Sequence, residues 1–133
     1  MIKENIIRIA SDTKYYGLKN LFTHKIKYKN RKCGDIIFLE LITKKSKIIS
    51  MRYETDSCIF CQASASLLAR SIRIFKVDKI NNDIKLLKDF FKNKKNKLPK
   101  RLYCFKKILL KDYLKRSECV MMPFNALLKA LKL

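Results

Sequence analysis

The chain has 133 residues, of which 48% are hydrophobic, and its 32 Lys and Arg against 11 Asp and Glu give a formal charge of +21. A chain of this length builds a single hydrophobic core, and its hydrophobic fraction is too high for a disordered tail. No stretch approaches the roughly 18 uncharged apolar residues of a membrane span, and the N-terminal residues lack the apolar run of a secretory signal. We therefore predict one domain over residues 1–133 of a cytoplasmic protein without a membrane segment.

The first half of the chain predicts a short helix followed by a small sheet. Residues 2–10 place Ile2, Ile6 and Ile9 on one helical face, and a loop around Gly17 follows. Residues 24–32 alternate basic and other side chains, which is typical of an edge strand, where Lys discourages unwanted pairing. Residues 35–43, rich in Ile, Phe and Leu, and residues 48–54, which follow a Lys-Lys-Ser-Lys turn, predict a β-hairpin.

The second half predicts helices. Small and straight-chain residues from Ser57 onwards indicate a helix of about 17 residues with Asp56 or Ser57 as its N-cap. Residues 78–91 predict an amphipathic helix, and residues 102–114 and 120–133, after Pro99, also have helical patterns. This order predicts an α+β fold with a small antiparallel sheet, about three-stranded, and helices packed on one side.

The cysteines are too few and too unevenly spaced for a disulfide framework, so they are thiols, metal ligands or both. In Cys33-Gly34-Asp35 the glycine lets the thiol and the carboxylate face one point. Cys58 and Cys119 lie near the starts of predicted helices, where free N–H groups stabilise a thiolate and make the sulfur more available as a nucleophile and metal ligand. Together the three thiols suit a soft-metal site, although each alone could be a buried small hydrophobe.

The other candidate residues point to packing rather than to chemistry. Cys104, in Leu-Tyr-Cys-Phe, is predicted to lie in the core. Cys58-Ile-Phe-Cys61 could form a redox pair, but the strand–helix alternation of a thioredoxin fold is absent, so we assign Cys61 to packing first and to a spare ligand second. His24, the only histidine, is predicted on the surface or the edge strand. Two glycines are too few for a phosphate-binding loop, which argues against nucleotide-dependent chemistry.

The charge allows an alternative function. Lysine supplies 25 of the 32 positive charges, and they are scattered, with the densest segment at residues 92–116. The chain is rich in Lys, Ile and Asn, whose codons can be written almost wholly in A and T. An AT-rich genome could therefore account for much of this charge. We favour a solvated basic face over a phosphate-binding groove. The alternative is a small basic RNA-binding or ribosome-associated protein.

Three segments of the chain surround the candidate cysteines. They are Asn30-Arg-Lys-Cys33-Gly34-Asp35, Asp56-Ser-Cys58-Ile-Phe-Cys61-Gln62-Ala63-Ser64-Ala65-Ser66 and Arg116-Ser-Glu-Cys119 with Ala126-Leu127 after it. Together they resemble the NifU, IscU and SufU family of iron–sulfur cluster assembly proteins. The family patterns are N-P-x-C-G-D, then G-x-G-C-x-I/L-x-x-x-A-S-x-S, then R-x-x-C followed by an apolar stretch and A-L. By this resemblance residues 1–133 form a single NifU-like N-terminal domain.

The resemblance implies a site and partners. Cys33, Asp35, Cys58 and Cys119 would meet at one exposed end and bind a metal or a transient iron–sulfur cluster, with the three cysteines as candidate persulfide acceptors. Among them we favour Cys58 or Cys119 as the sulfur acceptor, because helix starts favour a thiolate. The sulfur would come from a pyridoxal-phosphate (PLP)-dependent cysteine desulfurase and would pass to acceptor apoproteins. IscU-like members are cluster scaffolds rather than enzymes, whereas SufU-like members hold zinc and accept sulfur, as a zinc-dependent sulfurtransferase does. The 61-residue separation of Cys58 and Cys119 is more similar to the SufU branch.

The chain departs from the family patterns at identifiable positions. Thr55-Asp56-Ser57 replaces both glycines before Cys58, and Arg31 stands where the family has Pro. Glu118 precedes Cys119 where IscU-like proteins have His, and the L-P-P-V-K chaperone-binding motif is absent. A family member that has kept the fold and lost the activity is therefore a third alternative.

Overall fold

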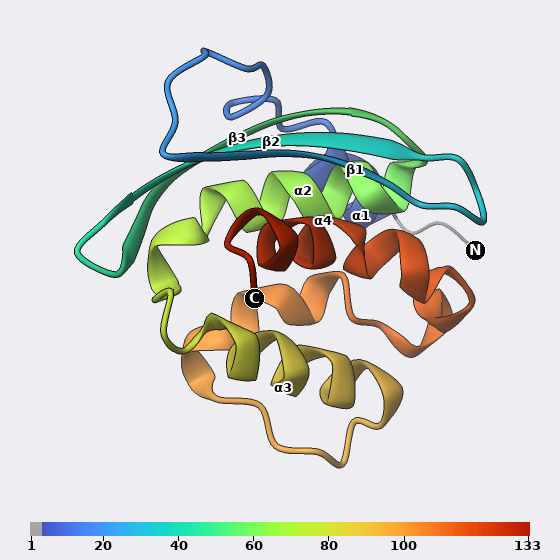
Figure 1. Ribbon diagram of the computed structural model, residues 1–133. Coiled ribbons are helices and arrows are strands. Elements are labelled where there is room, and N and C mark those ends of the chain that lie inside the picture. The colour runs from blue at the N-terminus through green and yellow to red at the C-terminus, as the bar shows by residue number, and fades with distance from the viewer. Residues whose placement is uncertain (1–3) are drawn as a thin grey trace.

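The computed structural model describes residues 4–133 and has the predicted α+β fold. Three antiparallel strands, in the order β1-β2-β3, form one sheet, and the helices gather on one of its faces (Figure 1). No helix within residues 4–133 is long and apolar enough to cross a membrane. The elements, including three short 3₁₀ helices (η), are α1 (Glu4–Ala10), β1 (His24–Lys29), β2 (Ile36–Lys44), β3 (Lys47–Asp56), α2 (Ile59–Arg70), η1 (Ile72–Ile74), α3 (Ile80–Lys92), η2 (Lys100–Lys107), η3 (Lys111–Arg116) and α4 (Ser117–Ala130).

The sheet confirms the predicted hairpin and edge strand. β2 and β3 are joined by a two-residue turn in which Lys45 and Ser46 both have positive φ, at 50° and 65°, as a type I′ hairpin requires. Alternate residues of β2 face the helices and are buried, while the lysines at alternate positions of β1 are exposed. The inner face of β2 therefore contributes to the hydrophobic core, and charged side chains protect the free edge of β1.

Residues 11–23 lie over the opposite face of the sheet (Figure 1). The Glu40 carboxylate is 5% exposed and accepts the backbone N–H groups of Lys19 and Asn20 at 2.8 and 3.0 Å. The Arg52 guanidinium donates to the carbonyls of Tyr16 and Gly17 at 2.8 and 2.9 Å. These charged groups of β2 and β3 hold the segment in place, because each satisfies backbone groups that belong to no strand or helix.

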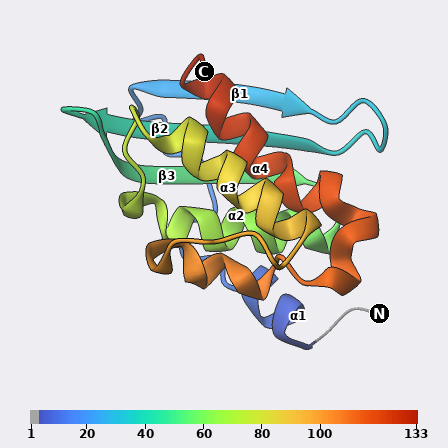
Figure 2. The same cartoon turned by 90° about the horizontal axis from the view of Figure 1, so that it is seen from below.

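The helices form two layers below the sheet. Figure 2 shows α3 on the far side of α4 from the sheet, with η2 and η3 beside it. The Ser64 hydroxyl of α2 donates to the Val120 carbonyl of α4, and the Ser66 hydroxyl donates to the Asp12 carbonyl just after α1. Small side chains at these positions let α2 approach its neighbours, and the hydroxyls join the three segments.

Two sequence predictions about the helices are wrong in detail. α2 begins at Ile59 with Cys58 as its N-cap, not Asp56 or Ser57, because β3 continues to Asp56 and pairs it with Ile36. The Ser57 hydroxyl instead accepts a hydrogen bond from Thr55 at 2.8 Å. α2 also ends at Arg70, so it has 12 residues, fewer than predicted.

Residues 102–114 form no α-helix. They belong to η2 and η3, which residues 108–110 separate. The buried side chains of Leu102, Phe105 and Ile108 are spaced by three, which matches the three residues per turn of a 3₁₀ helix. The last helix spans Ser117–Ala130 and so starts and ends earlier than predicted. Ile6 and Ile9 are buried as predicted, and Ile2 lies outside the described residues.

Candidate metal centre

Side chains from two distant segments meet at one end of the sheet. Cys33 and Asp35 belong to the loop between β1 and β2, and Cys119 lies in the first turn of α4. The two Sγ atoms and a carboxylate oxygen of Asp35 all lie within 4.8 Å of one another. Ligand atoms around one tetrahedral metal ion with bonds of about 2.0–2.3 Å are separated by roughly 3.3–3.8 Å. The group could therefore hold a metal ion after a small contraction.

The loop that carries Cys33 is a tight turn. The Asn30 carbonyl accepts the Gly34 N–H at 2.8 Å, and the Asn30 N–H donates to the Asp35 carbonyl at 2.9 Å. Gly34 has φ of +77°, in the left-handed region that favours glycine. The proposed role of Gly34 as a turn that presents both neighbouring side chains agrees with this geometry.

Cys58 joins the group through Asp35. The Cys58 N–H donates to Asp35 Oδ2 at 3.2 Å, so the carboxylate takes the place of a side-chain cap at the start of α2. The Cys58 thiol is half-buried, and its Sγ lies outside the three-residue group. The structure thus groups Cys33, Asp35 and Cys119 and places Cys58 beside them.

Cys119 differs from the prediction in its protonation. Burial, with smaller contributions from a hydrogen bond to Cys58 and from nearby negative groups, raises the pKa of its thiol to about 12. The start of a helix was expected to favour the thiolate, so this expectation is wrong for the metal-free protein: desolvation outweighs the helix N-terminus. A metal ion bound here would have to displace the proton.

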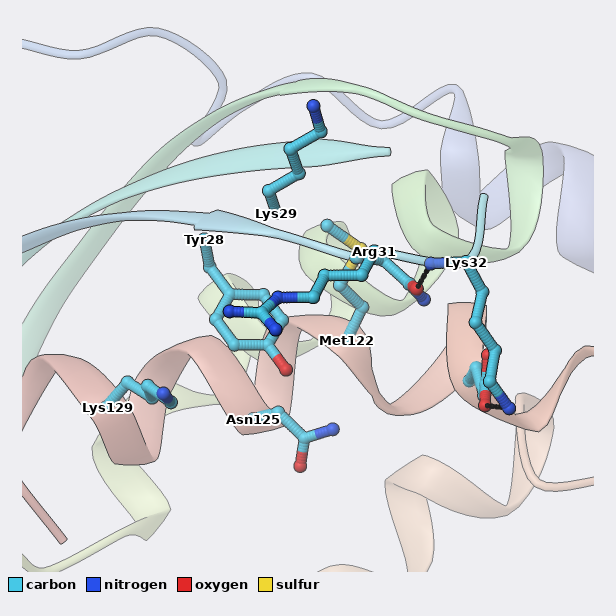
Figure 3. Close-up of a pocket in the computed structure, with 9 residues that line it drawn as sticks. Tyr28, Lys29, Arg31, Lys32, Met122, Asn125 and Lys129 are labelled. Carbon is cyan, nitrogen blue, oxygen red and sulfur yellow. Dashed lines mark hydrogen bonds and ion pairs between the residues drawn. The ribbon is translucent and has the colours of Figure 1, made fainter. Parts of the chain in front are cut away.

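An ion pair beside the thiols was not predicted. Lys32 Nζ lies 2.9 Å from Glu118 Oε1, and both side chains are more than half exposed (Figure 3). The pair links the residue before Cys33 to the residue before Cys119. The only sequence signal for this ion pair was that residues of opposite charge, Lys32 and Glu118, directly precede two candidate ligands. Predicting that they pair would have required knowing that the two segments meet.

The remaining candidates lie elsewhere or serve packing. Cys61 is fully buried, and burial raises the pKa of its thiol to about 12. Cys104 is half-buried at the edge of the core, with its Sγ 3.7 Å from the Ser71 hydroxyl. His24 lies on β1, as predicted, and its Nδ1 is 2.9 Å from the Thr23 hydroxyl. A further unpredicted contact is the hydrogen bond from Ser64 to the Val120 carbonyl, which fixes α4 one residue after Cys119.

Comparison with known proteins identifies the family. The model of the NifU-like N-terminal domain matches residues 1–120, so the chain belongs to this family, as its motifs predicted. No curated protein sequence matches the chain.

Two solved structures have the same fold. One is the N-terminal part of a nitrogen-fixing NifU-like protein from Brucella abortus, with a TM-score of 0.82 and 17% identity, covering 98% of this chain and 91% of that one. The other, from Fervidobacterium islandicum AW-1, is assigned as an iron–sulfur cluster assembly scaffold for the SUF system. It has a TM-score of 0.81 and 21% identity and covers 98% of this chain and 96% of that one. At these identities the structures establish a shared fold.

Proposed function

We propose that this protein acts in iron–sulfur cluster assembly, as a scaffold or sulfur acceptor that holds a metal ion or a transient cluster. The observation that carries the proposal is the meeting of Cys33, Asp35 and Cys119 within 4.8 Å, from segments more than 80 residues apart in the chain. Cys58, whose backbone N–H donates to Asp35, is the fourth proposed ligand. Membership of the NifU-like family and the fold shared with a SUF scaffold support the same function.

The donor set suits a cargo that must be released. Cys33 is exposed, so the group opens to solvent at one side. Thiolates favour soft metals, and a carboxylate among them forms a weaker bond than a fourth thiolate would. Because the Cys119 thiol is protonated in the metal-free protein, binding a metal releases a proton and weakens as the pH falls. The site is thus built for reversible loading rather than for a permanent structural metal.

Sulfur acceptance follows from accessibility. We infer Cys33 as the first acceptor, in place of Cys58 or Cys119, which the helix positions favoured. Cys33 is exposed, whereas Cys58 is half-buried and Cys119 is buried with a raised pKa. The Cys33 thiolate attacks the outer sulfur of a hydropersulfide on a PLP-dependent cysteine desulfurase. The S–S bond of the donor breaks, the donor cysteine leaves as a thiolate, and Cys33 retains the hydropersulfide. Acceptor apoproteins then receive the cluster or the sulfur.

The test is loading under anaerobic conditions. The protein is incubated with ferrous iron, cysteine and a cysteine desulfurase, then desalted, and iron, zinc and acid-labile sulfide are measured per chain. We expect iron with matching sulfide on the wild type, and loss of both in Cys33→Ser, Cys58→Ser and Cys119→Ser. Cys104→Ser is the matched control, because its thiol lies away from the group, and it should load like the wild type.

Two other results would change the conclusion. Zinc that survives the treatment, with no sulfide, would make the protein a zinc-dependent sulfur acceptor and not a cluster scaffold. If the three serine variants load metal and sulfide as the wild type does, the proposed function is refuted.

A further inference from the structure

A groove beside the thiol group is the strongest unexplained feature of the described residues. It lies between the end of β1 with its following loop, residues 28–32, and one face of α4, and has a volume of about 380 Å³. Four residues of α4 line it at spacings of four, three and four, as one face of a helix does. Figure 3 shows this arrangement. The α4 residues are Glu118, Met122, Asn125 and Lys129.

The charges of the groove are arranged along its length. Lys32 and Glu118 pair at the end next to the thiols and neutralise each other. Arg31 and Lys129 also line the groove, and no carboxylate of residues 4–133 forms an ion pair with either. Figure 3 shows Arg31 running back from the loop along the groove, whereas Lys29 points away from α4. Arg31 and Lys129 therefore give the groove two uncompensated positive charges along α4, and Lys29, a third cation of its lining, is directed away from α4.

Beside these charges the groove offers apolar and hydrogen-bonding surface, and Figure 3 shows the Arg31 side chain ending over the Tyr28 ring, with Met122 nearer to Lys32. Met122 and the ring of Tyr28 lie near its middle, and the Asn125 amide adds a donor and an acceptor (Figure 3). From Glu118 to Lys129 the helix rises about 16 Å, which is the length of roughly five residues of extended chain. A single small anion would leave most of this surface unused.

We propose that the groove binds an extended acidic segment of a partner protein, with acidic side chains at Arg31 and Lys129 and an apolar side chain at Met122. Guanidinium groups bind carboxylates through paired hydrogen bonds. A second copy of this chain is a poor occupant, because it brings another +21 charges and is repelled. A polyphosphate backbone is also a poor occupant, because it carries a charge at every unit and has no apolar group to contact Met122. The occupant is therefore an acidic peptide.

The position of the groove gives this binding a consequence. Its thiol end is formed by Lys32 and Glu118, each adjacent in sequence to a proposed ligand. A segment seated in the groove would place its partner against the exposed Cys33. This step rests on the proposed function, since it makes the partner the sulfur donor or the acceptor apoprotein; peptide binding itself does not depend on it.

The test uses a labelled peptide and the metal-free, reduced full chain. The probe is a fluorescein-labelled pentapeptide with leucine at its centre and aspartate at the other four positions. Fluorescence anisotropy gives its affinity, and ¹H–¹⁵N NMR locates it. We expect shifts in the amides of residues 28–32 and 118–129, and affinity losses of about two- to fivefold for Arg31→Gln and for Lys129→Gln, the range of exposed charge pairs. Lys25→Gln removes the same charge from an exposed position of β1 outside the groove and should bind normally.

Several results would overturn the proposal. Equal weakening by Lys25→Gln would show general charge attraction, and equal binding of the peptide with asparagine for aspartate would remove the acidic requirement. Inorganic phosphate, glutarate and a uridine pentanucleotide are tested in the same way. If one of them shifts the same amides at concentrations as low as the peptide does, that compound and not an acidic peptide is the class of ligand that the groove binds. Because no metal or sulfur is present, peptide binding can fail while cluster loading succeeds, and the reverse.

Discussion

The ion pair between α3 and η2 allows a quantitative stability prediction. Asp83 is 1% exposed, and its two carboxylate oxygens accept from Arg101 Nη1 and Nη2 at 2.7 and 2.6 Å. Removing one partner of a fully buried pair costs about 3–5 kcal/mol, because a buried charge is left alone. The Arg101 side chain is 46% exposed, so water can reach the carboxylate after Arg101→Met. We therefore expect a smaller loss than for a fully buried pair, about 2 kcal/mol in the free energy of unfolding.

The assay is urea unfolding followed by far-UV circular dichroism under reducing conditions at pH 7. Arg8→Met is the control, because Arg8 pairs with Glu4 four residues away on an exposed helix face and should lose less than about 0.5 kcal/mol. Combining Arg101→Met with Asp83→Asn should recover part of the loss, since no charge remains buried. A loss for Arg101→Met no larger than for Arg8→Met, or no recovery in the double variant, would refute the reasoning.

Four further predictions address the site, the core and the alternative function. Gly34→Ala should weaken metal binding and destabilise the fold by about 1–2 kcal/mol, because φ is +77° although no atom blocks the new methyl group; unchanged metal affinity would contradict this. Ser64→Ala should cost about 1 kcal/mol, whereas an unchanged urea midpoint would show that the hydrogen bond to Val120 is dispensable. The difference in the free energy of unfolding between the wild type and Cys61→Ala should narrow between pH 9 and 12. The Cys61 thiol ionises near pH 9 in the unfolded chain, whereas its pKa of about 12 keeps it protonated in the folded protein. A difference in urea unfolding that stays constant over this range would count against the burial of this thiol. Filter binding at physiological salt should detect no RNA complex, and an affinity that falls steeply with salt would favour the RNA-binding alternative.

The sequence by itself determined the order of the elements and the family. The alternating lysines of β1, the turn within residues 44–47 and the amphipathic pattern of α3 are local signals, so each appears in the structure where the pattern predicted it. The cysteine motifs were equally readable, because the residue types and spacings that define them lie within short segments. The fold class and the family therefore followed from the chain alone.

The tertiary structure decided what depends on distant contacts. Pairing of Asp56 with Ile36 extended β3 and moved the cap of α2 to Cys58, which no local cap preference could show. The sequence alone did not distinguish a 3₁₀ helix from an α-helix in η2, because the burial of side chains spaced by three is known only from the tertiary structure. Burial raises the pKa of the Cys119 thiol, whereas its position at the start of a helix was expected to lower it.

The groove and its ion pair also depend on contacts between segments that are distant in the sequence. Lys32 and Glu118 are 86 residues apart in the chain and 2.9 Å apart in space. Each alone is an ordinary exposed charge, one of many in this chain. Whether a charge pairs, lines a groove or is solvated is set by the three-dimensional arrangement of the backbone, because electrostatic interactions depend on separation in space and on exposure to water and not on distance along the sequence.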